Sequence, residues 1–375
     1  MGDDAFVVLD TIISDKAVGS AILSSNRAEK FHDLANHAIN TPAIEALDSL
    51  LSCYLTPNTK WKDIWKRDDC DTFREYVHLK ILTLSYPAAR FQMGMRISCL
   101  NGMGKEWFLS EASKVVLNKD DKSNWEAFVA GMMSQRYVFN DLLENVYKDA
   151  IRYTNTDEYQ AEHNERDEFS IENGLARHIS YDYAQLDKKE PDEKSITNYL
   201  FKHGSHAIKR MFFVDYKKQL KDDEHWDKSF LRLKALIDWR YEELRKSNFA
   251  PDKIEELSGF FNLFPVAVKL DPEWSLEKLK TIMNLLETNG EPYHPDLLID
   301  ALLEQAKNYP YLSAECLLSW VKHIKRTWYD FRDVTKLVQA IHETGDEASI
   351  EILKEIVSRL SAKGLCRDLV SLFND

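Results

Sequence analysis

The sequence predicts an all-α protein, and three observations lead to this prediction. From Asp271 to the C-terminus, helix-stop and helix-start signals recur at intervals of about 15 to 20 residues, with apolar residues at helical spacing between them. Glycine and proline are scarce, with 12 and 10 in 375 residues, whereas the helix formers Leu, Ala, Glu and Lys are plentiful. Residues 6–10 are the only strand-like run, and one strand cannot form a sheet.

The first two thirds of the chain carry helical patterns with irregular boundaries. In the first third, the expected helices cover residues 27–39, 42–54, 70–84, 88–100 and 106–117. The middle third has longer helices, separated by longer polar segments. Its expected helices cover residues 137–153, 169–186, 195–221 and 230–245.

The last third has the clearest helix boundaries. Asp271 and Pro272 form a helix start, and Asn289-Gly290 ends that helix after an apolar face of Leu276, Leu279, Met283 and Leu286. Five further helices are expected. The first begins at His294, the next two cover 313–323 and 330–343, the fourth buries apolar residues from Ile350 to Leu360, and a short last helix covers 365–372. Because the connections are short, consecutive helices must be antiparallel neighbours.

These features together predict a degenerate HEAT-like solenoid of antiparallel helix pairs without strict sequence repetition. We divide the chain into an N-terminal helical region (1–120), a central long-helix region (121–245) and a C-terminal helical-repeat region (246–375).

Charge and cysteine content narrow the classes of partner and compartment. The net charge of -13 disfavours binding to duplex DNA, which requires a positive field. The five cysteines lack Cys-x-x-Cys spacing, so neither a disulfide framework nor a zinc knuckle is expected. The N-terminus does not resemble a secretion signal, and no apolar run reaches the roughly 18 residues of a membrane span. We therefore expect a cytoplasmic protein that has no contact with membranes.

Motifs for metal and cofactor chemistry are incomplete. The segment from Asn101 to Lys105 lacks the length and the hydroxyl residue of a phosphate-binding loop, so a helix-to-helix turn is expected there. His203 and His206 are three residues apart and would share one helix face, but two imidazoles make half a metal site. We expect no metal, no cofactor and no catalytic residue in this chain.

One alternative is an RNA-cleaving protein. Arg27 and His32 have the Arg-x4-His spacing that resembles the motif of HEPN-type ribonucleases, in which the two residues act on an RNA phosphodiester. Ala28 departs from that motif, which usually has a polar residue there. The same residues are also expected on an ordinary solvated helix face, which we favour.

A basic run between Lys202 and Lys221 interleaves with apolar and aromatic residues. On an amphipathic helix, the apolar members would face the core and the bases would cover the rim, although a local RNA or phosphate surface is the alternative. The aromatic-rich stretch from Trp226 to Trp274 predicts either inter-repeat packing, which we favour, or an interface. Our candidate partner-binding residues are Lys209, Arg210, Lys217, Lys218, Trp239 and Trp274.

From about Trp125 onward, the pattern of aromatic and apolar positions resembles a C-terminal helical region of large bacterial anti-phage defence proteins. The resemblance rests on stretches such as FNDLLENVYKDAI and ELSGFFNLFPVAVKLDPEWSLEKL, with Trp239-Arg240, Phe260-Phe261, Trp274 and Gly364 at matching positions. In that family, a STAND-type nucleotide-binding, sirtuin-like or nuclease module lies upstream. The resemblance implies a HEAT-like scaffold or sensor that contacts proteins, with the catalytic module outside this chain.

The leading hypothesis is therefore a non-enzymatic scaffold or sensor for protein–protein recognition. Its expected partner is a protein, either a foreign protein or an effector subunit or domain, and self-association is left open. The alternative is a HEPN-like ribonuclease or an RNA-binding helical protein.

Overall fold

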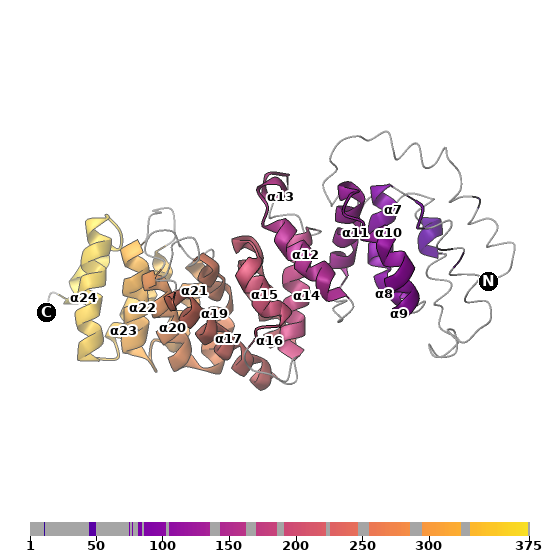
Figure 1. Ribbon diagram of the computed structural model, residues 1–375. Coiled ribbons are helices and arrows are strands. Elements are labelled where there is room, and N and C mark those ends of the chain that lie inside the picture. Colours follow the sequence, from indigo (N-terminus) through magenta and orange to yellow (C-terminus); the bar gives the residue numbers. More distant parts are fainter. Residues whose placement is uncertain are drawn as a thin grey trace. The chain divides into compact units, whose positions relative to one another are not determined.

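The chain forms two compact units (Figure 1). The computed structural model describes residues 11, 45–49, 75, 77, 82–84, 86–102, 105–135, 143–162, 170–185, 191–222, 226–246, 255–285, 295–323 and 331–373. The first unit comprises Met1–Asp182 and Glu193–Ile208, and the second comprises Tyr183–Asp192 and Lys209–Asp375. The proposed boundaries near residues 120 and 245 stay a prediction.

Every element in the described ranges is helical, so the all-α prediction is confirmed. The first unit contains α7 (Pro87–Met95), α8 (Ile97–Gly102), α9 (Lys105–Trp107), the π-helix η2 (Phe108–Ala112), α10 (Ser113–Val116), α11 (Lys122–Ser134), α12 (Glu144–Thr154), α13 (Asp157–Glu162), most of α14 (Ile171–Gln185) and α15 (Ile196–His203). None of the described helices is both long and apolar enough to cross a membrane.

Two glycines allow α7 and α11 to pack closely in the first unit. A Cβ atom at Gly94 would lie 2.1 Å from the carbonyl oxygen of Phe128, and one at Gly131 would lie 1.9 Å from that of Phe91. Both contacts are with backbone atoms, which have little room to move. The two helices therefore approach at a distance that only glycine permits at these positions.

The second unit ends in three successive helix pairs. Its elements are most of α16 (His206–Asp222), then α17 (Trp226–Lys246), the 3₁₀ helix η4 (Glu255–Gly259), α19 (Phe260–Leu270), α20 (Pro272–Leu285), α21 (Pro295–Gln305), α22 (Pro310–His323), α23 (Arg332–His342), α24 (Glu347–Ala362) and the 3₁₀ helix η5 (Arg367–Phe373). Helices α19, α21 and α23 begin at residues 260, 295 and 332, and α20, α22 and α24 begin at 272, 310 and 347. The interval between equivalent helices is therefore 35 to 38 residues.

The helices of these pairs lie in two layers. Helix α22 packs against both α20 and α24, and α21 packs against both α19 and α23, so each helix contacts the next but one along the chain (Figure 1). Two ion pairs between successive pairs, Lys269–Glu304 at 3.2 Å and Lys280–Glu315 at 2.7 Å, each join residues 35 apart. The spacing of the ion pairs thus follows the structural repeat.

Several predicted boundaries are wrong. The expected helix at 195–221 is interrupted at Gly204-Ser205, where α15 ends and α16 begins. Tyr309-Pro310 starts α22, which was expected to begin at Ser313, because proline is suited to the first helical position. Helix α11 was not anticipated, although the side chain of Asp121 caps it by accepting a hydrogen bond from Asn124 N. The strand-like residues 6–10 lie outside the described ranges.

Candidate functional site

Three aromatic rings on α17 and α20 each have a cation over their face. Lys234 Nζ lies 5.2 Å from the ring centroid of Trp274, Lys278 Nζ lies 5.1 Å from that of Tyr241, and Arg240 Cζ lies 4.9 Å from that of Trp239. The three aromatic side chains are neither fully buried nor fully exposed. We call Tyr241 and Trp274, with Lys234 and Lys278, the aromatic–cation surface. Trp239 lies two residues from Tyr241 and therefore on another face of α17, and its cation, Arg240, is buried. A cation held over a ring in this way is attracted by the negative face of the π-system.

Each of these cations is also paired with an acid from another element. Lys234 on α17 pairs with Asp271 at 2.6 Å, and Lys278 on α20 pairs with Asp238 on α17 at 2.6 Å. The side chains of Lys234 and Lys278 are only 26% and 22% exposed, so both are partly removed from solvent. These ion pairs therefore hold both lysines in position and link α17 to α20 and to the residue that precedes it.

The position of Trp274 is set by the start of α20. The carboxylate of Asp271 accepts a hydrogen bond from Trp274 N at 3.3 Å and so caps the helix. The indole packs edge-on against Phe230 and Phe260, with centroid distances of 5.9 Å in both cases. Edge-to-face packing of this kind stabilises a single ring orientation. Trp274 thus packs in the core and is also partly exposed, so its position is compatible with both packing and an interface, the two alternatives that the sequence left open.

Arg240 belongs to a buried ionic cluster that contains a second predicted residue. Arg240 Nε donates to Glu256 Oε1 at 2.7 Å, and Lys209 Nζ lies 3.5 Å from Glu256 Oε2. Glu256 is fully buried, and the side chains of Arg240 and Lys209 are 8% and 9% exposed. The expectation that Lys209 covers an exposed rim is therefore wrong, because a buried carboxylate 47 residues later holds its ammonium group inside.

The other candidate bases of α16 lie closer to solvent. Lys218 is exposed and pairs with Asp215, while Arg210 and Lys217 are half-buried. The apolar members of the strip, Phe212, Phe213 and Tyr216, are fully buried, which confirms the amphipathic interpretation for this part of the helix. Helix α16 packs closely on η4, since a Cβ atom at Gly259 would lie 2.7 Å from Phe213 Cδ2.

The first unit contains a buried tyrosine–histidine pair that the sequence did not reveal as notable. Tyr147 Oη lies 2.7 Å from His178 Nδ1, and His178 Nε2 lies 2.8 Å from the carbonyl oxygen of Gln135. A carbonyl can only accept, so Nε2 carries the proton and the phenol donates to Nδ1. Burial lowers the pKa of His178 from 6.5 to about 4, with a smaller opposite effect of the Gln135 carbonyl. The imidazole is therefore neutral and serves as a packing element.

A second buried polar cluster holds the break between α15 and α16. Ser205 Oγ donates to Glu172 Oε1 at 2.6 Å, and Gln160 Nε2 donates to the same oxygen at 2.9 Å. Ser205 Oγ also accepts the backbone N–H of Ile208 at 3.3 Å, which caps α16. The serine is thus held in a structural role, and its hydroxyl is not presented as a nucleophile.

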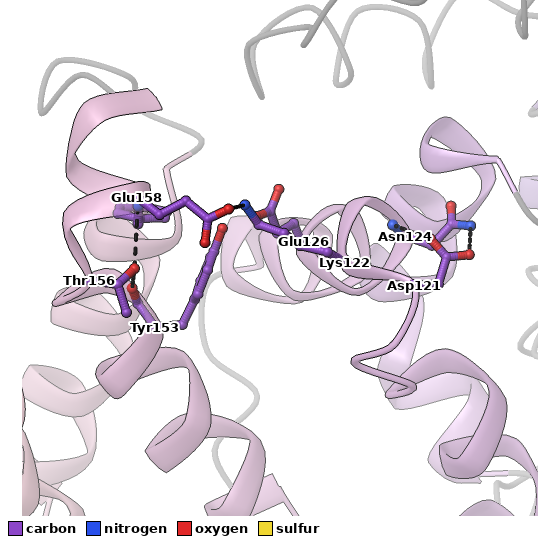
Figure 2. A network of polar contacts seen from close by, with 8 residues as sticks. Asp121, Lys122, Asn124, Glu126, Tyr153, Thr156 and Glu158 are labelled. Atoms are coloured by element: carbon purple, nitrogen blue, oxygen red, sulfur yellow. Dashed lines mark hydrogen bonds and ion pairs between the residues drawn. The ribbon is translucent and has the colours of Figure 1, made fainter.

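One lysine joins the start of α11 to α13, as Figure 2 shows. Lys122 Nζ lies 2.5 Å from Glu158 Oε1 and 3.6 Å from Glu126 Oε1, and it lies 5.7 Å from the ring centroid of Tyr153. In Figure 2 the ring of Tyr153 rises between the two helices, beside these carboxylates. This network positions α13 and offers no arrangement of reacting groups.

His203 and His206, whose spacing was weighed as half a metal site, do not lie on one helix face. His203 ends α15 and His206 begins α16, with an extended residue, Gly204, between the helices. Within the described ranges, no group of three or more His, Cys, Asp and Glu side chains is arranged to hold a metal ion. Arg27 and His32, the residues of the ribonuclease alternative, lie outside the described residues.

Comparison with known proteins adds no relative: no protein-family model, curated protein or solved structure matches the chain.

Proposed function

We propose that this chain is a non-enzymatic, HEAT-like helical scaffold whose aromatic–cation surface binds a protein partner in the cytoplasm. The observation that carries the proposal is the pair of partly exposed aromatic rings, Tyr241 and Trp274, each with a lysine over its face. Tryptophan, tyrosine and arginine are the residue types most enriched at the energetic centres of protein interfaces.

The helices that carry the surface support this role. Ion pairs to Asp271 and Asp238 fix the lysines in place before any partner arrives. A surface that is already ordered loses less side-chain entropy on binding, so more of the interaction energy remains as affinity. Stacked helix pairs are also typical of proteins that present extended binding surfaces.

The resemblance to defence-protein C-terminal regions suggests the kind of partner. In that setting the partner is an effector subunit or domain, or a foreign protein that the scaffold senses, and the catalytic module lies elsewhere. The net charge of -13 is consistent with a protein partner and disfavours duplex DNA.

The test compares two substitutions on the surface with one away from it. The full chain is used to capture its partner from native cells, and the affinity is then measured with both proteins purified. Tyr241→Ala and Lys278→Ala should each weaken binding about tenfold or more. Tyr311→Ala is the control, because Tyr311 is 44% exposed and lies on α22. Equal affinity in all three variants, or a strictly monomeric chain that captures nothing, would overturn the proposal.

The ribonuclease alternative is tested separately. Labelled RNA is incubated with the wild-type chain and with His32→Ala. Cleavage by the wild type that is lost in the variant would replace the scaffold proposal with the HEPN-like one, whereas no binding at low salt would remove RNA as a partner.

A further inference from the structure

The first unit contains a group of cations around one tyrosine, separate from the surface proposed to bind protein. Lys148 Nζ and Arg152 Cζ, both on α12, lie 5.5 and 5.3 Å from the ring centroid of Tyr199 on α15. The ring of His203, one turn further along α15, lies 4.4 Å from the same ring. We call these four residues, together with Lys202, the Tyr199 cluster.

The elements bring these groups together by helical spacing. Lys148 and Arg152 are four residues apart, so they lie on one face of α12. Tyr199 and His203 are likewise four residues apart on α15, with Lys202 beside them, and α12 packs against α15. Basic residues near a helix C-terminus complement the helix dipole. That effect explains Arg152, Lys202 and His203, but it explains neither Lys148, which lies in the second turn of α12, nor the approach of two cations from α12 to a ring on α15.

Among the described residues, the acids paired with the cluster do not balance its positive charge. Glu144 pairs with Lys148 at 2.5 Å. For Arg152 and Lys202, the described part of the chain supplies no acidic partner, and both side chains are exposed. Three cations less one carboxylate leave a net charge of +2 with the histidine neutral. Such a concentration of positive charge is unexpected in a chain with a net charge of -13.

The ring positions the cations without neutralising them. Like charges one helical turn apart repel each other, and the π-system of Tyr199 offsets part of that repulsion. The guanidinium N–H groups of an arginine over a ring remain able to donate hydrogen bonds. The hydroxyl of Tyr199 is buried and has no hydrogen-bond partner among the described residues, so the ring rather than the hydroxyl holds the cations. A group of donors with a net charge of +2 matches one doubly charged oxyanion.

We propose that the Tyr199 cluster binds a phosphate dianion, either as inorganic phosphate or as the phosphate of a small molecule such as a mononucleotide. Arg152 supplies paired N–H donors, and Lys148 and Lys202 supply ammonium groups from the two helices. Tracking of a nucleic acid backbone is disfavoured, because the acidic remainder of the chain would repel a long polyanion.

Calorimetric titration of the full chain tests the proposal, with inorganic phosphate and a 5′-mononucleotide as probes and chloride at equal ionic strength as the blank. Saturable binding of phosphate is expected, and Arg152→Ala should weaken it about tenfold or more. Tighter binding of the mononucleotide would identify the ligand as a nucleotide, whereas equal affinity would identify it as the free anion. Both results support the site.

Matched variants separate the site from general electrostatics. Tyr199→Phe keeps the ring and should retain binding, whereas Tyr199→Leu removes it and should weaken binding. Arg359→Ala removes an exposed arginine of α24 that pairs with Glu355, and it should have no effect. The proposal is overturned if no saturable binding occurs below about 10 mM phosphate. It is also overturned if Arg359→Ala weakens binding as much as Arg152→Ala, or if affinity grows with the length of a single-stranded RNA.

Discussion

The buried histidine of the first unit makes the stability of the protein depend on pH. His178 is fully buried and neutral, with its two nitrogens engaged by Tyr147 and by the carbonyl of Gln135. Its pKa is about 4 in the folded protein, compared with 6.5 for an ordinary histidine. The unfolded chain therefore binds a proton between pH 6.5 and 4 that the folded chain does not bind. The stabilisation is fully present above pH 6.5 and is lost as the pH falls towards 4.

The size of the effect follows from the two pKa values. Each pKa unit corresponds to about 1.4 kcal/mol, so the full difference is worth about 3 kcal/mol. Between pH 7 and pH 4.5, the free energy of unfolding should fall by roughly 2 to 3 kcal/mol through this residue alone. His178→Gln removes the titration but keeps one donor and one acceptor at similar positions.

Urea unfolding followed by far-UV circular dichroism at pH 7 and pH 4.5 measures the effect. Because acidic residues also titrate in this range, the informative quantity is the stability difference between the wild type and His178→Gln. We expect this difference to shrink by roughly 2 to 3 kcal/mol on acidification, which corresponds to a shift on the order of 1 M urea. His342→Gln controls for the loss of a half-buried histidine. The reasoning is refuted if the difference is the same at both pH values, or if His342→Gln reproduces it.

Two further predictions concern stability and use the same urea measurement. Glu256→Gln leaves Arg240 and Lys209 as buried cations without a carboxylate, so it should lower the free energy of unfolding by about 3 to 5 kcal/mol. The control is Asp333→Asn, which removes an exposed pair with Lys336 and should lower it by less than about 1 kcal/mol. Similar costs for the two variants would contradict the buried cluster. Gly131→Ala places a methyl group against the carbonyl of Phe91 and should cost about 3 kcal/mol or more. No cost, or a gain in stability of up to about 1 kcal/mol as helix propensity alone predicts for Gly→Ala inside a helix, would contradict the close approach of α7 and α11.

The helices of the last third could be predicted because their boundary signals are local. Asp271 and Asp346 each cap the helix that follows, and both residues are of the type that favours this position. The break within the expected helix 195–221 was missed, although the residues that cause it lie at the break itself. Gly204 ends α15 and Ser205 caps α16, but the apolar pattern continues across both residues and favours one long helix. Here a strong periodicity outweighed two weaker boundary signals that were correct.

The side-chain environments could not be predicted, because they depend on partners distant in sequence. Lys209 looked like an exposed base because its own helix is amphipathic, yet Glu256 on η4 places it inside. Trp239 and Trp274 were identified as aromatic candidates, but the sequence does not show which rings receive a cation. Lys278 reaches Tyr241 from a helix that begins 46 residues after the start of α17, and only packing brings them together. His178 drew no attention because nothing local marks a histidine as buried.

The structural repeat links the proposed protein-binding surface to the rest of the second unit. Lys278 and Lys280 are neighbours on α20, and they pair with Asp238 on α17 and Glu315 on α22. Helix α20 is therefore held from both sides by ion pairs of its own surface residues. The outer residues of α24 pair with each other instead, Lys354 with Glu351 and Arg359 with Glu355. Binding determinants are thus expected where α17 and α20 place aromatic rings under cations, and substitutions on the outer face of α24 should leave partner affinity unchanged.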